Sequence, residues 1–352
     1  MVKEAESGGN FDPSQSDLRV LLGLMRYPGL PVSGAAERSG IPVSTFSSVT
    51  RRLEENRCFH RLLLPSIWDM GGDVVSFDLV RSPELGNENW PGSGILSGHR
   101  YQVMQNCDQD TMISVSVSPR YEDLLKWRSR FLRKLHGSKL PHSHDFMEFP
   151  CEGLEFFSFF DFTSVIEGQL GPEGSGESIG NHISGATPEV EMNRTFHLIL
   201  KSMMTRPDLN NRELAEYLGL SRQTVNRFVR LAKEKGLLNP VVIPDMGVLG
   251  YDIMGVFFLD LKDEIHHIDP EDLEDADRAL RCKRFFNVYS TGRQVIFTVH
   301  RDYDDFRRTS RVVTGIYHTM GIRGVTPIVS PVVLGPGGRS PLFYLDRMAD
   351  ML

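Results

Sequence analysis

The sequence repeats itself, and this repeat restricts the fold more than any other feature. A shift of 179 residues aligns residues 27–57 with residues 206–236 without a gap. The identical pairs include Pro28/Pro207, Leu30/Leu209, Ala36/Ala215, Glu37/Glu216, Gly40/Gly219, Thr45/Thr224 and Arg51/Arg230. A shift of 182 residues aligns 116–127 with 298–309, where Tyr121 meets Tyr303. An internal repeat at a fixed offset indicates one structural unit built twice, so we expect two copies of a two-part unit.

The second copy begins with the pattern of a helix-turn-helix. Asn210 and Glu213 form a plausible capping box at the start of a helix. Gly219 ends that helix, because the tight turn that follows needs a residue tolerating positive φ. Ser221 then caps a second helix. Two helices joined in this way are typical of DNA-binding proteins whose second helix enters the major groove.

The helix after Ser221 separates its polar and apolar residues onto two faces. Val225, Phe228 and Ala232 are expected in the core, and the opposite face carries long hydrogen-bonding side chains. Such side chains can pair with base edges, while neighbouring Lys and Arg residues neutralise phosphates. The predicted DNA-binding residues of this copy are Ser221, Arg222, Gln223, Thr224, Asn226, Arg227, Arg230 and Lys233.

The first copy keeps the apolar face of this helix but not the long polar side chains. Phe46, Val49 and Leu53 stand at the core positions. Serines replace most of the outward residues, and serine reaches a base only at close approach. The predicted DNA-binding residues here are Ser44, Thr45, Ser47, Ser48, Arg51 and Arg52. We expect the second helix-turn-helix to be the main major-groove binder and the first to contact DNA weakly or to serve packing.

The charge distribution supports a nucleic-acid partner in spite of a net charge of −7. Residues 17–65 hold seven Lys/Arg against four Asp/Glu, and residues 196–240 hold eight against four. The remainder of the chain therefore carries a charge of −14. Two basic segments on an acidic body suit a protein of which only part touches phosphate.

Composition excludes several other classes. The 352 residues are 40% hydrophobic, with no apolar run long enough to span a membrane and no secretory signal at the start. The four cysteines are far apart in sequence and form no CxxC pair, which favours reduced thiols. These features predict a cytoplasmic protein with no membrane partner.

The segment that follows each helix-turn-helix is rich in β-branched and aromatic residues. The first part of residues 239–261 predicts a two-stranded wing packed on the helices. Residues 253–335 then parse as strand, helix (270–281), strand, strand, helix (303–321) and strand, the ferredoxin-like order βαββαβ. Residues 74–164 give the same order less clearly, ending in an aromatic strand over 154–162.

These patterns predict an α+β fold with two winged helix-turn-helix domains, each followed by a ferredoxin-like domain. A Gly-, Ser- and Glu-rich segment between the copies reads as a flexible linker. The predicted domains are winged helix-turn-helix 14–70, ferredoxin-like 71–165, linker 166–192, winged helix-turn-helix 193–250, ferredoxin-like 251–338 and a C-terminal tail helix 339–352.

Residues 210–238, 243–259 and 288–306 together resemble the Lrp/AsnC (feast/famine) transcription regulators of bacteria and archaea. The resemblance implies a winged helix-turn-helix joined to a ferredoxin-like domain that dimerises and can sense small molecules. It also implies that Ser221 to Arg230 form the recognition helix and that Thr291 and Gly292 lie near the effector region. Family members usually carry one such unit. Two units predict an intrachain pseudo-dimer, with further homo-oligomerisation left open.

Three other functions compete with a DNA-binding regulator. His136, His142, His144 and Cys151 could form a metal or haem site, but such loose spacing is more typical of a solvated loop, and we expect neither metal nor cofactor. The architecture also resembles sirohaem decarboxylases, for which His300, Arg301 and Tyr303 could line a pocket. The third alternative is an interaction protein that keeps its helix-turn-helix units for packing. We expect a regulator without catalytic residues.

Overall fold

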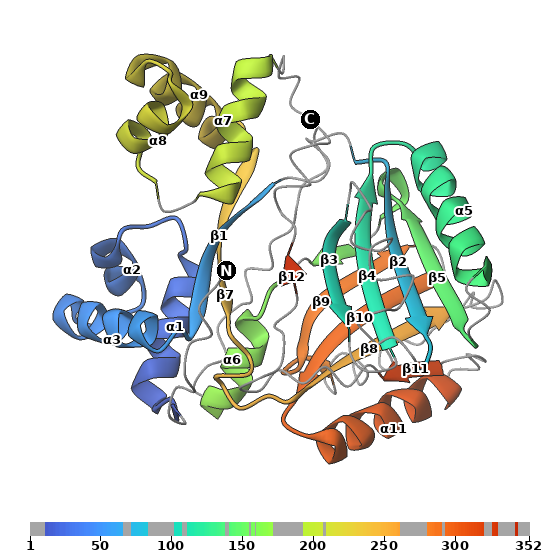
Figure 1. The fold of residues 1–352 in the computed structure, drawn as a ribbon. Helices are drawn as coiled ribbons and strands as arrows, with labels where there is room; N and C mark the ends of the chain where they lie inside the picture. Colours follow the sequence, from blue (N-terminus) through green and yellow to red (C-terminus); the bar gives the residue numbers. More distant parts are fainter. Residues whose placement is uncertain are drawn as a thin grey trace. The chain divides into compact units, whose positions relative to one another are not determined.

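The computed structural model of the chain describes residues 11–65, 72–83, 102–107, 111–137, 141–154, 156–158, 160–171, 193–206, 209–260, 280–290, 293–319, 326–329 and 342–343. Helices and β-sheets both contribute to the fold (Figure 1), which is the mixed α+β class that the sequence predicts. Within the described residues no helix is long and apolar enough to cross a membrane.

The chain divides into two compact units, and each unit combines segments from both halves of the sequence. One unit comprises Met1–His60, Glu155–His182 and Val242–Ser340, and the other comprises Arg61–Leu154, Ile183–Val241 and Pro341–Leu352. The first helix-turn-helix therefore belongs to the same unit as the second ferredoxin-like domain. The domain boundaries proposed along the sequence stay a prediction, because this division groups the segments in another way.

Three helices build the first helix-turn-helix, namely α1 (Gln15–Arg26), α2 (Val32–Arg38) and α3 (Val43–Glu55). Its turn contains Gly40 at φ +65°, a left-handed conformation that a side chain would strain. Phe46, Val49 and Leu53 of α3 are buried as predicted. The apolar face of α3 is thus the face that packs on α1 and α2.

The second helix-turn-helix contains α7 (Arg194–Thr205), α8 (Asn211–Leu218) and α9 (Arg222–Glu234). Asn210 and Glu213 form the predicted capping box at the start of α8, and Gly219 ends α8 at φ +65°. Ser221 caps α9, where its side chain accepts a hydrogen bond from the amide of Thr224. These local predictions are confirmed, because each depends on residues only a few positions apart.

One strand follows each helix-turn-helix, β1 (Phe59–Pro65) and β7 (Leu238–Pro244), and the two pair in a two-stranded sheet. The strand that pairs with β7 therefore comes from the segment after the first helix-turn-helix and not from the residues that follow β7. After β7 the chain makes a turn in which Asp245 accepts a hydrogen bond from the amide of Val248, and the next strand joins another sheet. Gly250, at φ +79°, then directs the chain into the next strand.

The second ferredoxin-like domain has the predicted strands and its second helix. These elements are β8 (Ile253–Asp260), β9 (Arg284–Ser290), β10 (Arg293–His300), α11 (Tyr303–Thr319) and β11 (Thr326–Val329). The sheet order is β11-β8-β10-β9-β6. Buried phenylalanines, among them Phe257, Phe286 and Phe297, fill its core. The helix predicted over 270–281 lies outside the described residues except at its end.

The first ferredoxin-like domain contains β2 (Val74–Arg81), β3 (Gln102–Cys107), β4 (Thr111–Ser118), α5 (Tyr121–Gly137) and β5 (Ser143–Pro150), in the sheet order β12-β3-β4-β2-β5. Its last strand was predicted over 154–162, and this prediction is wrong. The polar, histidine-bearing segment 143–150 pairs with β2 along its whole length. A half-exposed edge strand tolerates such polar residues, which made it look like a loop in sequence.

The aromatic run after the short helix η1 (Cys151–Gly153) has a different partner. Its strand β6 (Phe156–Ser158) pairs with β9 and so extends the sheet of the second ferredoxin-like domain. Helix α6 (Thr163–Leu170) follows and occupies the first residues of the predicted linker. In the predicted tail helix, Leu342–Phe343 form strand β12, which pairs with β3, and the rest of the tail lies outside the described residues.

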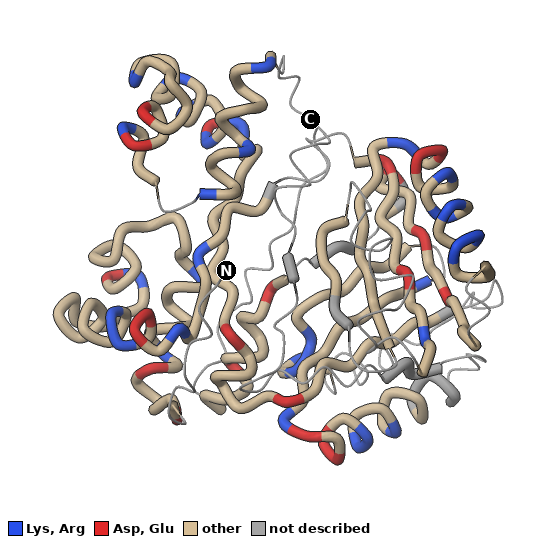
Figure 2. Tube along the Cα trace, viewed as in Figure 1, with Lys and Arg blue, Asp and Glu red and all other residues tan. Residues whose placement is uncertain are grey.

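Charged residues are distributed less simply than the sequence balance suggests. Figure 2 shows Lys and Arg on α8 and α9 but also along α5. The exposed basic residues of α5 are Lys126, Arg130, Arg133 and Lys134. The acidic remainder predicted from the charge count is therefore not acidic on every element.

Candidate DNA interface

Helix α9 is held rigidly at its start and along its inner face. The Ser221 hydroxyl lies 2.8 Å from the Thr224 hydroxyl and accepts a hydrogen bond from the Thr224 amide at 3.1 Å. Val225, Phe228 and Ala232 are buried as predicted, and the Phe228 ring stacks on Phe196 of α7 with centroids 4.9 Å apart. The direction of the helix is therefore set by packing and capping together.

The opposite face of α9 is exposed and polar. Arg222, Gln223, Asn226, Arg227, Arg230 and Lys233 are all exposed, and Thr224 is half-buried under the Ser221 cap. The sequence therefore located the outward-facing residues of α9 correctly, while their binding of DNA remains a prediction.

Among the described residues, Arg227 and Arg230 of α9 have weak partners. Arg230 faces Glu234 at 3.6 Å, but both side chains are largely exposed, and such pairs contribute about 0–1 kcal/mol. The Arg227 guanidinium lies 4.5 Å from the centre of the Phe228 ring. Neither contact would prevent the guanidinium from turning to a phosphate or a guanine edge, because little free energy is lost on leaving it.

Asn226 has a partner that sequence reasoning missed. The amide nitrogen of Asn211, the first residue of α8, donates a hydrogen bond to Oδ1 of Asn226 at 2.8 Å. The two residues are fifteen positions apart on different helices. No periodicity or motif links such a pair, so only the crossing of α8 and α9 brings them together.

Basic residues flank this face without belonging to it. Arg212 pairs with Glu216 at 3.1 Å on the surface of α8, and the Arg206 guanidinium lies 5.6 Å from the centre of the Tyr217 ring. Lys235 is exposed just beyond the end of α9. These positions suit contacts to phosphates, which need charge but no fixed orientation.

In the first helix-turn-helix the corresponding face of α3 is also exposed but carries short side chains. Ser44, Thr45, Ser47 and Ser48 are exposed, and the Ser48 hydroxyl donates to the Thr45 carbonyl at 3.0 Å. Arg51 faces Glu55 at 3.6 Å, and both are exposed. The serine and threonine side chains of this face are too short to extend to the base edges at the floor of a DNA groove.

Arg52 of α3 has a structural partner. Its Nε donates to the buried carboxylate of Asp17 at 3.1 Å, and that carboxylate also caps α1 with Ser14. Burial alone would raise the pKa of Asp17, but hydrogen bonds from Arg52 and Ser14 outweigh it, so the pKa is lowered. The predicted phosphate contact of Arg52 thus competes with an ion pair that joins α3 to α1.

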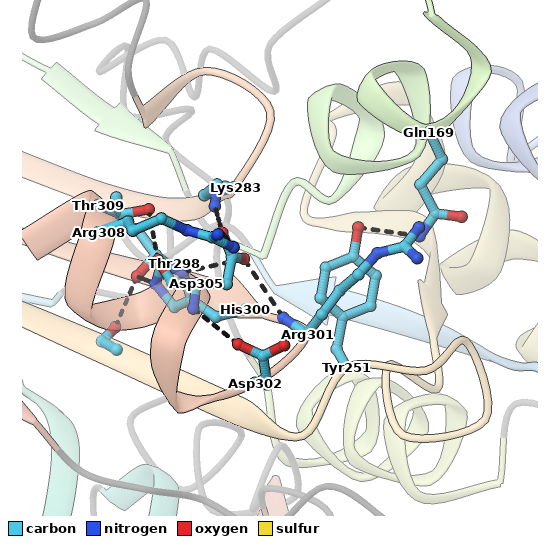
Figure 3. A network of polar contacts seen from close by, with 11 residues as sticks. Gln169, Tyr251, Lys283, Thr298, His300, Arg301, Asp302, Asp305, Arg308 and Thr309 are labelled. Carbon is cyan, nitrogen blue, oxygen red and sulfur yellow. Dashed lines mark hydrogen bonds and ion pairs between the residues drawn. The ribbon is translucent and has the colours of Figure 1, made fainter.

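Helix α6, which the sequence analysis missed, connects the first helix-turn-helix to the second ferredoxin-like domain within their common unit. The Arg26 guanidinium of α1 binds Glu167 of α6 at 2.6 Å. Gln169 donates to the Tyr251 hydroxyl at 2.8 Å, beside the Gly250 bend (Figure 3). A Cβ on Gly168 would lie 2.4 Å from Cβ of Cys282, so the close contact there requires glycine.

The three residues considered for a catalytic pocket differ in their exposure to solvent. His300 is fully buried. Its Nε2 lies 2.7 Å from the Thr298 hydroxyl and its Nδ1 lies 3.6 Å from Asp305. Figure 3 shows Thr298 and Asp305 beside His300. Arg301 and Tyr303 are exposed. Burial lowers the pKa of His300. The His300 ring and the Lys283 ammonium together hold the pKa of Asp305 well below its usual range.

The histidines proposed for a metal site make two separate sets of contacts. Nε2 of His144 lies 3.0 Å from the buried carboxylate of Asp78, which also accepts from Arg128 at 3.2 Å. Burial would raise the pKa of Asp78, but His144 and Arg128 together lower it. His136 and His142 contact each other with ring centres 5.2 Å apart. Among the residues that the structure describes, no three His, Cys, Asp or Glu side chains could hold a metal ion together.

The predicted effector residues Thr291 and Gly292 lie outside the described residues. Their neighbours Ser290 and Arg293 pair across β9 and β10.

Comparisons with known proteins agree with the fold in two ways. The model of a winged helix-turn-helix DNA-binding family matches residues 192–239, which contain α7, α8 and α9. The siroheme decarboxylase NirDL matches with a TM-score of 0.51 at 10% identity, covering 95% of this chain and 97% of that chain. Its complex with an iron-uroporphyrin III analogue matches with a TM-score of 0.50. At this identity the likeness shows the fold alone.

A shorter match involves a transcriptional regulatory protein of the AsnC family from Pyrococcus furiosus. It has a TM-score of 0.32 at 15% identity and covers 38% of this chain and 86% of that chain. The search of curated proteins found no match.

Proposed function

We propose that the protein is a sequence-specific DNA-binding transcription regulator and that α9 is its main recognition helix. The observation that carries this proposal is the exposed face of α9, on which Gln223, Asn226, Arg227 and Arg230 project from a helix held by its cap and its buried side. The match of residues 192–239 to a winged helix-turn-helix DNA-binding family supports it.

The chemistry of this face fits the major groove. Arginine can donate two hydrogen bonds to O6 and N7 of guanine, and glutamine or asparagine can pair with N6 and N7 of adenine. An exposed helix also fits the width of that groove. The lysines and arginines around α9 would add affinity that does not depend on sequence.

The first helix-turn-helix has a secondary role in this proposal. Its serines and Arg51 could contact the DNA backbone, whereas Arg52 is engaged by Asp17. The ferredoxin-like domains would serve pairing within the chain and the sensing of a small molecule, as the resemblance to Lrp/AsnC regulators implies. Effector binding near Thr291 and Gly292 belongs to the same proposal.

The test is DNA selection followed by binding measurements. The full-length protein would select its site from a randomised duplex library, and fluorescence anisotropy would measure affinity for that site. Replacing Arg227 and Arg230 by Ala should lower specific affinity by at least about 30-fold, because each base contact contributes about 1–3 kcal/mol.

A matched control removes the same charge elsewhere. Arg307 and Arg311 are exposed on α11, and replacing both by Ala should change specific affinity much less. Circular dichroism would verify that all variants fold. Unchanged DNA binding after loss of Arg227 and Arg230 would refute the role of α9.

A second candidate is a decarboxylase acting on a tetrapyrrole. The likeness in fold to the siroheme decarboxylase NirDL, which extends over 95% of this chain, favours it. Two observations weigh against it: the His300 ring is buried and engaged by Thr298, and Arg301 and Tyr303 are exposed. Incubation with siroheme, followed by mass spectrometry for loss of carboxyl groups, distinguishes the two functions.

A further inference from the structure

Asn211 and Asn226 form a contact at the point where α8 and α9 cross. Nδ2 of Asn211 donates to Oδ1 of Asn226 at 2.8 Å. Asn211 is half-buried, and Asn226 is exposed on the proposed DNA-binding face. In the part of the chain that the structure describes, no other residue bonds the side-chain amide of Asn226.

The backbone on both sides of this contact is fixed. Asn211 is the first residue of α8, whose start is held by the capping box of Asn210 and Glu213. Asn226 lies one turn into α9, between the buried Val225 and Phe228. A hydrogen bond between two fixed helices holds the Asn226 side chain in one rotamer before any ligand arrives, which lowers the ordering cost of binding.

The contact also couples the orientation of the Asn226 amide to that of Asn211. An asparagine side chain has a donor and an acceptor of nearly equal size, and a half-turn exchanges them. Base recognition in the major groove depends on the order of donors and acceptors. In the arrangement that the structure has, Asn211 occupies Oδ1 of Asn226 and leaves Nδ2 free to donate, and the opposite arrangement requires both amides to turn together.

The first helix-turn-helix lacks both members of this contact. At the positions 179 residues earlier, Val32 replaces Asn211 and Ser47 replaces Asn226. A valine side chain offers no hydrogen bond, and serine has no amide to orient. The contact thus occurs only beside the helix that carries the long polar side chains.

We propose that Asn211 is a specificity-determining residue that orients Asn226 for base recognition without itself reaching the base. This inference rests on the proposed function of α9. It predicts that Asn211 affects the preference at the one base pair that Asn226 contacts and at no other position of the DNA site.

The experiment compares base preferences of the full-length protein and its variants, measured by selection from one randomised duplex library. Asn226→Ala should abolish the preference at one position of the selected site. Asn211→Ala should reduce the preference at that same position by about 3- to 10-fold, the range expected from releasing one held side chain. The double variant should show no further loss beyond Asn226→Ala, because Asn211 acts through Asn226.

A carboxylate at position 211 gives a sharper result. Asn211→Asp can only accept, so Asn226 must turn its Nδ2 toward it and direct its Oδ1 to the DNA. The preferred base at that position should then change in identity, toward a base that offers a donor. An Asp in the first turn of α8 suits the helix dipole, so the fold should persist.

Arg212→Ala is the control, because Arg212 lies next to Asn211 and is exposed. It should lower affinity for all sequences alike and leave every preference unchanged. Preferences identical to the wild type in both Asn211 variants, or losses spread evenly over the site, would refute the inference while leaving α9 as the recognition helix. A wild-type protein that enriches no sequence would refute the proposed function and this inference together.

Discussion

At the scale of single residues, the two helix-turn-helix units differ in what they can do with the same backbone. The helices α3 and α9 bury corresponding apolar residues, Phe46 and Val225 among them. Their exposed faces differ in reach, since Ser47 takes the position of Asn226. A side chain with two polar atoms at the end of a stem can pair with a base edge, and a hydroxyl next to the backbone mostly cannot.

This difference predicts unequal effects of alanine substitutions on DNA binding. Asn226→Ala should lower affinity for the selected site by about 5- to 100-fold, because it removes one base contact of about 1–3 kcal/mol. Ser47→Ala and Ser48→Ala should each change it by less than about 3-fold, since serine contributes no bidentate pair. Anisotropy titrations with one duplex compare all three. Equal losses in the two units would contradict the assignment of α9 as the main recognition helix.

A second residue-scale prediction concerns pH. Asp305 has a lowered pKa, because the His300 ring and the Lys283 ammonium stabilise its ionised form. A carboxylate with a lower pKa in the folded than in the unfolded state adds stability above its ordinary value of 3.8, and this stability is lost as the pH falls through the folded-state value. Asp305→Asn should therefore destabilise the protein at pH 7 by about 1–3 kcal/mol.

Urea denaturation at several pH values checks this. The stability difference between the wild type and Asp305→Asn should be largest near neutral pH and should shrink below pH 4. Asp304, the exposed neighbour, serves as the control, and Asp304→Asn should have little effect at any pH. A difference that is independent of pH would argue against an ionised Asp305 as the source of the stability.

At the scale of elements, α6 has a role that its short length does not suggest. It packs in one unit with α1 through the Arg26–Glu167 ion pair and with the ferredoxin-like domain through Gly168 and Gln169. This helix therefore joins the first helix-turn-helix to the second ferredoxin-like domain within one unit. Packed side chains, hydrogen bonds and ion pairs of this kind are contacts through which two domains can be coupled.

Gly168→Ala should disturb this connection. The added methyl group would overlap Cβ of Cys282, and overpacking of this kind costs about 1–3 kcal/mol. Thermal unfolding should therefore show a lower Tm. Gly137→Ala provides the control, because a Cβ at the end of α5 meets nothing within 4 Å. Equal Tm values for the two variants would indicate that α6 does not pack tightly on its neighbours.

At the scale of the whole molecule, each unit depends on both halves of the chain. In one unit β6 adds to β9, and Gln169 binds Tyr251, so residues from before and after position 182 share a sheet and a hydrogen bond. Neither half of the sequence contains a complete copy of this unit. The two sequence repeats are thus not two independent folding units.

Cleavage between the halves should consequently leave them associated. A protease site introduced within residues 172–192 and cut in the native protein should yield two fragments that elute together in size-exclusion chromatography. In urea the same fragments should separate, because their contacts are non-covalent. Native fragments that elute separately would contradict the shared unit.

The sequence by itself determined the local elements. The Asn210–Glu213 capping box, the Gly219 turn, the Ser221 cap and the exposed face of α9 were all predicted, because each arises from residues within one or two turns of one another. The strands and second helix of the second ferredoxin-like domain were predicted for the same reason, since their apolar patterns are strong and continuous.

Only the tertiary structure decided which elements belong together. The pairing of β1 with β7, the place of β5 beside β2 and the addition of β6 to β9 all join segments whose own sequences do not specify a partner. The contact of Asn211 with Asn226 likewise depends on how two helices cross. Strand pairing and side-chain contact over long sequence distances are set by the burial of the whole unit, which a local pattern does not contain.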